Sequence, residues 1–178
     1  CECMINQYKV KLKNTNFTTV RFGNVINSSG SVIPIFKKQI ERGGPVTVTD
    51  PKMERYLMSV SEAVKLVLLS HLATENSSEC FVLDMGKPVK ILNIAKLMIK
   101  SITGLDHKDS SIEIKFIGIK EGEKIYEEPL IDENSIKTKF DKIYFTEQNT
   151  VNLNDLKSFL DFIRKFYFKN DINFFKKE

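Results

Sequence analysis

The sequence predicts an α/β fold, in which strands and helices alternate along the chain. Two observations carry this prediction. Short runs rich in β-branched and aromatic residues, which are typical of buried strands, recur through the sequence. Between them lie longer stretches whose apolar residues recur every three or four positions, which is the period of a helix. With 178 residues, 42% of them hydrophobic, the chain is long enough to bury a core.

Four short segments predict strands. Each is rich in β-branched or aromatic residues and is bounded by residues that commonly end strands, such as glycine, asparagine, serine or aspartate. The VTVT segment alternates strictly, as a strand with one buried face does. The predicted strands are residues 17–25, 46–49, 80–83 and 112–117.

Four longer segments predict helices, because their apolar residues follow helical spacing. Ser59 and Glu62 match a capping box, so we expect a helix to begin directly after Ser59. Gly43 and Gly44 end the first predicted helix, and Gly104 ends the third. The predicted helices are residues 32–40, 63–72, 91–102 and 153–163.

The composition narrows the possible function classes. The net charge of +4 is small, and the lysines are interleaved with acidic residues instead of forming a basic stripe. We therefore predict no nucleic-acid partner, and a basic nucleic-acid binder is kept only as an alternative. No apolar run approaches the ~20 residues of a membrane span, and no N-terminal apolar segment indicates a signal peptide.

The cysteines indicate a reducing compartment. Three are too few for a disulfide framework, and their odd number agrees with a cytoplasmic location. Cys1 and Cys3 lack the spacing of a zinc site with His71 or His107, so we predict no metal. Cys80 stands beside apolar residues and is expected in the core.

An α/β chain prompts a search for a dinucleotide site, and the sequence contains none. No two of the eight glycines stand two positions apart, so Gly-x-Gly-x-x-Gly cannot occur. The Walker pattern and the Gly-x-Ser-x-Gly nucleophile elbow are also missing. No tyrosine or methionine is followed four residues later by lysine. We therefore assign no catalytic residue to this chain.

Four motifs carry a resemblance to a known family. They are residues 20–35 (VRFGNVINSSGSVIPI), 43–58 (GGPVTVTDPKMERYLM), 81–89 (FVLDMGKPV) and 117–130 (IGIKEGEKIYEEPL). In this order and spacing they resemble the C-terminal half of the CapD-like polysaccharide-biosynthesis family of extended short-chain dehydrogenases. Within that family the sequence is most similar to UDP-N-acetylglucosamine 4,6-dehydratases.

The resemblance covers residues 1–146 and implies a division of the chain. Residues 1–30 are expected to end a Rossmann-like sheet, and residues 31–146 to form a smaller α/β substrate-binding portion with a return strand at 79–84. Residues 147–178 are then a helical tail. Since the chain begins with Cys1 and not Met, the family's glycine loop and its catalytic Tyr-x-x-x-Lys or Met-x-x-x-Lys are expected upstream.

The resemblance also implies a nucleotide-sugar site. Arg55 matches the family's diphosphate contact, a role that suits a planar guanidinium, and Asn24 matches a contact in the same region. The family's Arg-Pro-Gly-Glu signature is here Lys120-Glu121-Gly122-Glu123, in which Glu123 is expected to accept ribose hydroxyls. Lys120 keeps the charge of the usual arginine but loses its fork.

Further contacts follow from the same resemblance. Those expected for the substrate are Ser31, Val32, Thr47 and Thr49, and those expected near the nicotinamide are Phe22 and Gly23. Taken without the resemblance, Arg55 is better explained as a surface ion-pair partner of Glu54 or Asp50.

The prediction is the nucleotide-sugar-binding portion of an NAD(P)-dependent UDP-sugar 4,6-dehydratase of surface polysaccharide or glycan biosynthesis, inactive by itself. NAD(P) is expected in the complete enzyme and not on this chain alone. The expected partners are a UDP-sugar, the N-terminal half or a full-length partner, and further copies of the chain. Two alternatives stay open: a non-catalytic UDP-sugar-binding or assembly module, and a related nucleotide-sugar epimerase.

Overall fold

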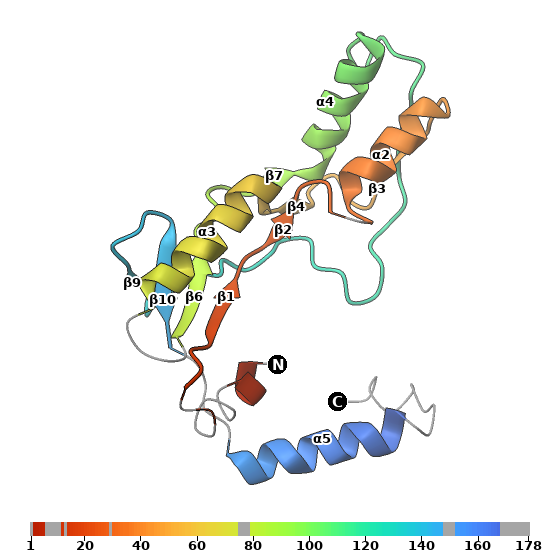
Figure 1. The fold of residues 1–178 in the computed structure, drawn as a ribbon. Coiled ribbons are helices and arrows are strands. Elements are labelled where there is room, and N and C mark those ends of the chain that lie inside the picture. Colours follow the sequence, from red (N-terminus) through yellow and green to blue (C-terminus); the bar gives the residue numbers. More distant parts are fainter. Residues whose placement is uncertain are drawn as a thin grey trace.

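A computed structural model of the chain describes residues 2–5, 12, 14–28, 30–74, 79–147 and 152–167. It confirms the α/β class, with strands and helices alternating along the sequence (Figure 1). The elements form two groups, each with its own buried cluster of apolar side chains. Short paired strands connect the two groups, and the candidate site lies on these connections.

The first group is built on a four-stranded sheet in the order β1-β6-β10-β9. Strands β1 (Thr18–Arg21) and β6 (Glu79–Leu83) are parallel, with Val20 opposite Phe81. Strand β10 (Ile143–Thr146) runs antiparallel to β6 and to β9 (Ile136–Lys137). Helix α3 (Val60–Ala73) packs on this sheet, and its buried residues share one apolar cluster with Phe81, Leu83 and Ile143.

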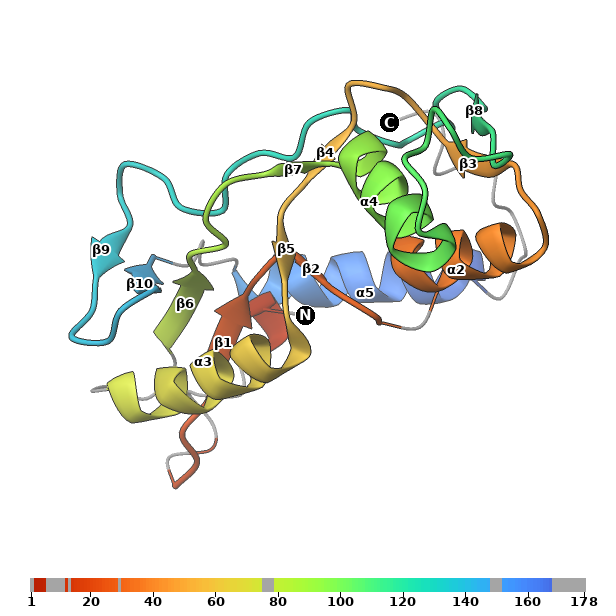
Figure 2. The ribbon, with the colours of Figure 1, turned by 90° about the horizontal axis from the view of Figure 1, so that it is seen from above.

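The second group pairs two helices over a short two-stranded sheet. Helices α2 (Val32–Glu41) and α4 (Ile91–Thr103) lie side by side (Figure 2). Strands β3 (Val46–Val48) and β8 (Ile114–Phe116) pair in parallel beside them. The largest fully buried side chains of this cluster are Phe36, Val46, Val48 and Ile99.

Four two-residue strands connect the groups. Strand β2 (Asn24–Val25) pairs in parallel with β5 (Leu57–Met58). Strand β4 (Glu54–Arg55) pairs antiparallel with β7 (Val89–Lys90). Helix α5 (Leu153–Tyr167) lies apart from both groups in Figure 1. No helix in the described ranges is long and apolar enough to cross a membrane.

The helix boundaries predicted from capping residues are confirmed. The Glu62 N–H donates to Ser59 Oγ at 3.2 Å, which caps α3 as expected. The Glu62 carboxylate does not complete the box, because it accepts a hydrogen bond from Lys142 Nζ at 2.6 Å. Gly104 ends α4 with φ +76°, the left-handed conformation that glycine adopts at no steric cost.

The single strand predicted over residues 17–25 is wrong, since the structure divides it into β1 and β2. The break falls at Phe22 and Gly23, between a strand of the large sheet and a strand of a separate pair. A Cβ added at Gly23 would lie 3.3 Å from side-chain atoms of both Tyr56 and Met85. The absence of a side chain at Gly23 therefore permits the close packing on which this break depends.

Some of the other predictions agree with the structure, and some elements of the structure were not predicted. Strands β4, β5, β7, β9 and β10 were not among the predicted elements. Cys80 is buried in β6, as expected. Residues 2–5 are helical, whereas Cys1 and residues 6–11 lie outside the described residues, as do residues 168–178. The division of the chain at residues 30 and 146 stays a prediction. In the structure, α3 and β10 contribute side chains to the same buried cluster as β6.

Candidate functional site

A cavity of about 340 Å³ lies between the second group of elements and the short strands that connect the two groups. Its walls come from the end of β2, the start of α2, strands β3 and β4, and the turn at residues 120–123. Seven of the eight predicted substrate contacts line it: Asn24, Ser31, Val32, Thr47, Thr49, Arg55 and Glu123. Besides Ser28 and Gly30, the rest of the lining is apolar: Val25, Ile26, Ile33, Phe36, Val48, Met53, Leu57 and Ile91.

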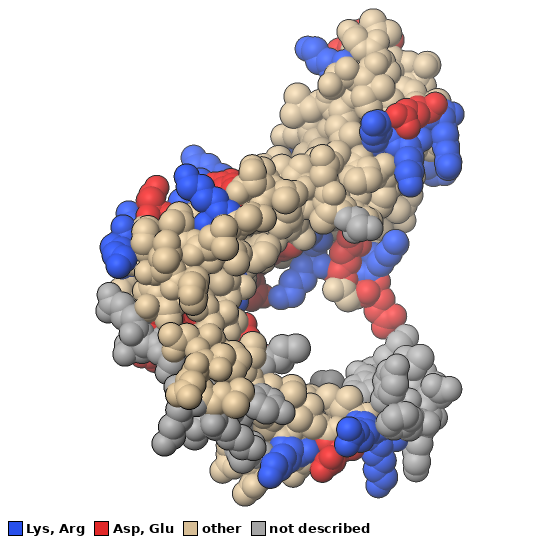
Figure 3. Space-filling model, in the orientation of Figure 1, with Lys and Arg blue, Asp and Glu red and all other residues tan. Residues whose placement is uncertain are grey.

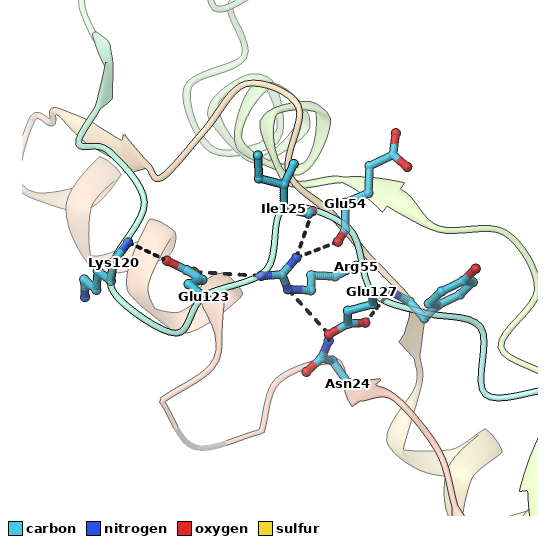
Figure 4. Close-up of polar contacts among 8 residues, drawn as sticks. Asn24, Glu54, Arg55, Lys120, Glu123, Ile125 and Glu127 are labelled. Atoms are coloured by element: carbon cyan, nitrogen blue, oxygen red, sulfur yellow. Dashed lines mark hydrogen bonds and ion pairs between the residues drawn. The ribbon is translucent and has the colours of Figure 1, made fainter. Parts of the chain in front are cut away.

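Arg55 is the only positively charged residue among the described residues that line the cavity. Its side chain is 16% exposed and its Nη1 donates to the carbonyl oxygens of Glu54 (2.7 Å) and Ile125 (3.2 Å) (Figure 4). Its Nε lies 3.5 Å from Glu127 Oε1, and its Nη2 lies 3.9 Å from Glu123 Oε1. Glu54 contributes a carbonyl and not a carboxylate, so the ion pair expected from sequence alone forms with other partners.

Glu127 was missed by the sequence analysis. Its Oε1 accepts a hydrogen bond from Asn24 Nδ2 at 2.9 Å, and its Oε2 accepts one from the Tyr56 N–H at 3.3 Å. Asn24 and Glu127 are separated by 103 positions. No local pattern could have linked them; the only sequence signal is that Glu127 falls inside the 117–130 motif.

Ser31 and Thr47 both line the cavity and differ in how their hydroxyls are bonded. Ser31 precedes α2, but its hydroxyl does not cap the helix, and among the described residues it is buried with no hydrogen-bond partner. The side-chain amide of Gln39 forms two hydrogen bonds with Thr47. Thr47 Oγ1 accepts from Gln39 Nε2 at 2.7 Å, and the Thr47 N–H donates to Gln39 Oε1 at 3.0 Å. Gln39 was not recognised from sequence.

Glu123 and Lys120 form one tight turn. The Glu123 N–H donates to the Lys120 carbonyl at 3.0 Å, and the Lys120 N–H lies 3.4 Å from Glu123 Oε2. Glu123 lines the cavity, whereas Lys120 does not, and the Lys120 side chain points away from Arg55 in Figure 4. A substrate contact by Lys120 stays a prediction that this arrangement does not support.

The two residues expected near a nicotinamide lie beside the cavity and do not line it. Phe22 is partly exposed at the end of β1, and Gly23 packs against Tyr56 and Met85. The 178 residues contain no glycine-rich dinucleotide loop, so by themselves they do not fit NAD(P). Within the described ranges, no group of three or more His, Cys, Asp or Glu could hold a metal ion.

Comparison with known proteins identifies relatives of this chain. A family model described as "Polysaccharide biosynthesis protein" matches residues 1–148. The capsular polysaccharide biosynthesis protein CapD of Staphylococcus aureus is 50% identical over 145 residues, which are 80% of this chain and 23% of CapD. A UDP-glucose 4-epimerase of Rickettsia canadensis is 34% identical over 134 residues, which are 74% of this chain and 37% of the epimerase.

A solved structure shares the fold over most of the chain. The X-ray structure of Pen from Bacillus thuringiensis aligns with a TM-score of 0.68 and 30% identity, covering 89% of this chain and 54% of Pen. The fold is thus that of the extended, Rossmann-like short-chain dehydrogenases. More narrowly, the chain belongs to the polysaccharide biosynthesis protein family. It spans less than two fifths of the length of the curated relatives named here.

Proposed function

We propose that this chain is the nucleotide-sugar-binding portion of an NAD(P)-dependent UDP-sugar 4,6-dehydratase of the UDP-N-acetylglucosamine type. The observation that carries the proposal is the cavity, which gathers Asn24, Ser31, Thr47, Arg55 and Glu123 from separate segments of the chain. Its volume of about 340 Å³ lies within the range of small-molecule pockets, roughly 300 to 1,000 Å³. Membership of the polysaccharide biosynthesis family supports the same class of substrate.

The chemistry of the lining suits a ligand that carries both phosphates and hydroxyls. Arg55 offers its Nη2 edge, because its Nη1 is already bonded to two backbone carbonyls. The start of α2 adds the backbone N–H groups of Val32 and Ile33, which have no acceptor within the helix, and the positive end of a helix dipole; both favour a diphosphate. Glu123 supplies acceptor oxygens for ribose hydroxyls, and Thr47 and Thr49 supply polar groups beside the base.

In this proposal, the residues that carry out the hydride transfer belong to the complete enzyme and not to this chain. In the complete enzyme a bound NAD(P) would supply transient hydride acceptance. The sugar would be oxidised at C4, would lose the C5 proton and the C6 hydroxyl as water, and would receive the hydride back at C6. The residues present here bind and orient the nucleotide sugar only. We accordingly expect the 178-residue chain, incubated with UDP-N-acetylglucosamine and NAD, to show no dehydratase turnover. A cytoplasmic location and a role in surface polysaccharide or glycan synthesis belong to the same proposal.

A related nucleotide-sugar epimerase is the second candidate. The 34% identity to a protein named UDP-glucose 4-epimerase favours it. The two candidates share the nucleotide-binding contacts and differ in what happens to the sugar. Formation of a 4-epimer by the complete enzyme, without loss of water, would select the epimerase.

Calorimetry with UDP and with UDP-N-acetylglucosamine tests the proposal. A charge-assisted hydrogen bond contributes about 1.5–3 kcal/mol, so Arg55→Ala is expected to weaken binding roughly 10- to 100-fold. Arg42→Ala is the matched control, because Arg42 is exposed at the end of α2 and should leave the affinity unchanged. Unchanged binding by Arg55→Ala would remove Arg55 from the diphosphate contact. A folded wild-type chain that binds neither ligand would favour an assembly module.

A further inference from the structure

Glu127 accepts two hydrogen bonds and forms one ion pair, but it does not itself line the cavity. The hydrogen bonds come from Asn24 Nδ2 on β2 and the backbone N–H of Tyr56, and the ion pair is with Arg55 Nε on β4 at 3.5 Å. Figure 4 shows the Glu127 carboxylate between the Asn24 amide and the Arg55 guanidinium. Two of the predicted substrate contacts, from strands of different pairs, are thus joined through one carboxylate.

The carboxylate determines how the Asn24 amide is turned. An ionised carboxylate only accepts hydrogen bonds, so the amide nitrogen of Asn24 must face Glu127. The amide oxygen then points away from Glu127, as Figure 4 shows. Asn24 therefore presents Oδ1 as an acceptor, a group better suited to a ligand hydroxyl or N–H than to a phosphate oxygen.

The same carboxylate limits how Arg55 can rotate. Nε is held toward Glu127 and Nη1 is held by the carbonyls of Glu54 and Ile125. Nη2 lies 3.9 Å from Glu123, beyond hydrogen-bond distance, and is the part of the guanidinium left for a ligand. A guanidinium fixed in this way loses little side-chain freedom when an anion binds.

We propose that Glu127 is a positioning residue that orients Arg55 and Asn24 for the nucleotide sugar without touching it. This inference rests on the proposed function of the cavity. The opposite effect is physically possible, because a carboxylate near a diphosphate also repels it. The two effects differ in sign: loss of the charge weakens binding if positioning dominates and strengthens it if repulsion dominates.

A double-mutant cycle in the full chain measures the coupling. The dissociation constant for UDP is determined by calorimetry for the wild type, Glu127→Gln, Arg55→Lys and the double variant. We expect Glu127→Gln to weaken binding roughly tenfold in the wild type and only about twofold in the Arg55→Lys background. A loss of folding stability alone would not reproduce this dependence on Arg55. Glu128→Gln is the matched control, because its exposed carboxylate pairs with Lys124 and should leave the affinity unchanged.

Each outcome has a distinct reading. No UDP binding by the folded wild type would overturn the proposed function itself. An Arg55→Lys variant that binds as well as the wild type would leave the function standing but refute the positioning of the guanidinium by Glu127. If Arg55→Lys weakens binding but Glu127→Gln does not, or tightens it, the function stands and the positioning role is refuted. An equal loss in both backgrounds would also refute it. Should Glu127→Gln fail to fold, Glu127→Asp takes its place in the cycle with the same expected coupling.

Discussion

Arg55 on β4 and Arg21 on β1 belong to different sheets and have very different surroundings. Arg55 is mostly buried and bonded to backbone carbonyls, which leaves one edge for a ligand. Arg21 forms a two-point contact with Glu2, in which Nε donates to Oε1 at 2.7 Å and Nη2 bonds the other oxygen. Both partners are about one third exposed. The hydrogen bonds that Arg21 donates to Glu2 lower the pKa of the Glu2 carboxyl and raise the pKa of the Arg21 guanidinium.

This pair predicts a pH-dependent contribution to stability. Because the pKa of Glu2 is lower in the folded chain, the contribution is present above the unfolded-state pKa and is lost as the pH falls through the folded-state value. Glu2→Gln should reduce the free energy of unfolding by about 0.2–1 kcal/mol near neutral pH and by less at acid pH, once the pH falls through the folded-state pKa of Glu2. Urea unfolding at both pH values measures the difference. Glu133→Gln, at an exposed site, is the control, and a Glu2 effect that does not change with pH would contradict the assignment.

At the scale of elements, the strands that sequence patterns missed hold the first group together. Strand β10 lies between β6 and β9, and its Ile143 is fully buried against Phe81 and Leu83. Four residues are too few to show a period, and the partner strand β6 lies some sixty positions away. A strand of this kind is defined by what it pairs with and not by its own sequence.

Ile143→Ala tests how much β10 contributes to the stability of the fold. Removing a fully buried isoleucine side chain leaves a cavity and is expected to lower the free energy of unfolding by about 2–5 kcal/mol. Ile136→Ala on the neighbouring strand β9 is the matched control, since Ile136 is largely exposed and should cost less than about 0.5 kcal/mol. Chemical denaturation of both variants gives the two values. Equal costs would mean that β10 is not part of the cooperative core.

At the scale of the whole molecule, the sheet group leaves apolar surface uncovered. Strand β1 is the edge of the described sheet, and one of its sides has no partner strand there. Along α3, four aliphatic side chains at intervals of four residues are each more than half exposed: Val60, Val64, Leu68 and Leu72. Figure 3 shows a surface largely free of charged side chains over this helix. An open strand edge beside an apolar stripe is a typical site of self-association.

We therefore expect the chain to associate with itself in solution. Sedimentation equilibrium should give an average mass that rises above the monomer value of 20.5 kDa with concentration. The double variant Leu68→Lys and Leu72→Lys should lower that mass by placing two charges on the stripe. Ile102→Lys, at an exposed apolar position on α4, is the control and should not change it. A wild-type chain that stays monomeric at high concentration would refute the expectation.

The sequence by itself determined the α/β class, the four long helices and the helix ends marked by Ser59 and Gly104. These features depend on contacts within a few residues, such as the bond from the Glu62 N–H to Ser59 Oγ, so a local pattern is enough to predict them. The motif resemblance also named the residues of the candidate site, seven of which line one cavity.

Only the tertiary structure decided how those residues are held. The division of the first strand at Gly23, the insertion of β10, and the roles of Gln39 and Glu127 all depend on chain segments that meet in space. Glu127 reaches Asn24 across 103 positions and shares its carboxylate with Arg55, an arrangement that exists only once the strands have paired. Helices follow from local hydrogen bonds, whereas strand pairing and buried polar contacts are set by long-range packing.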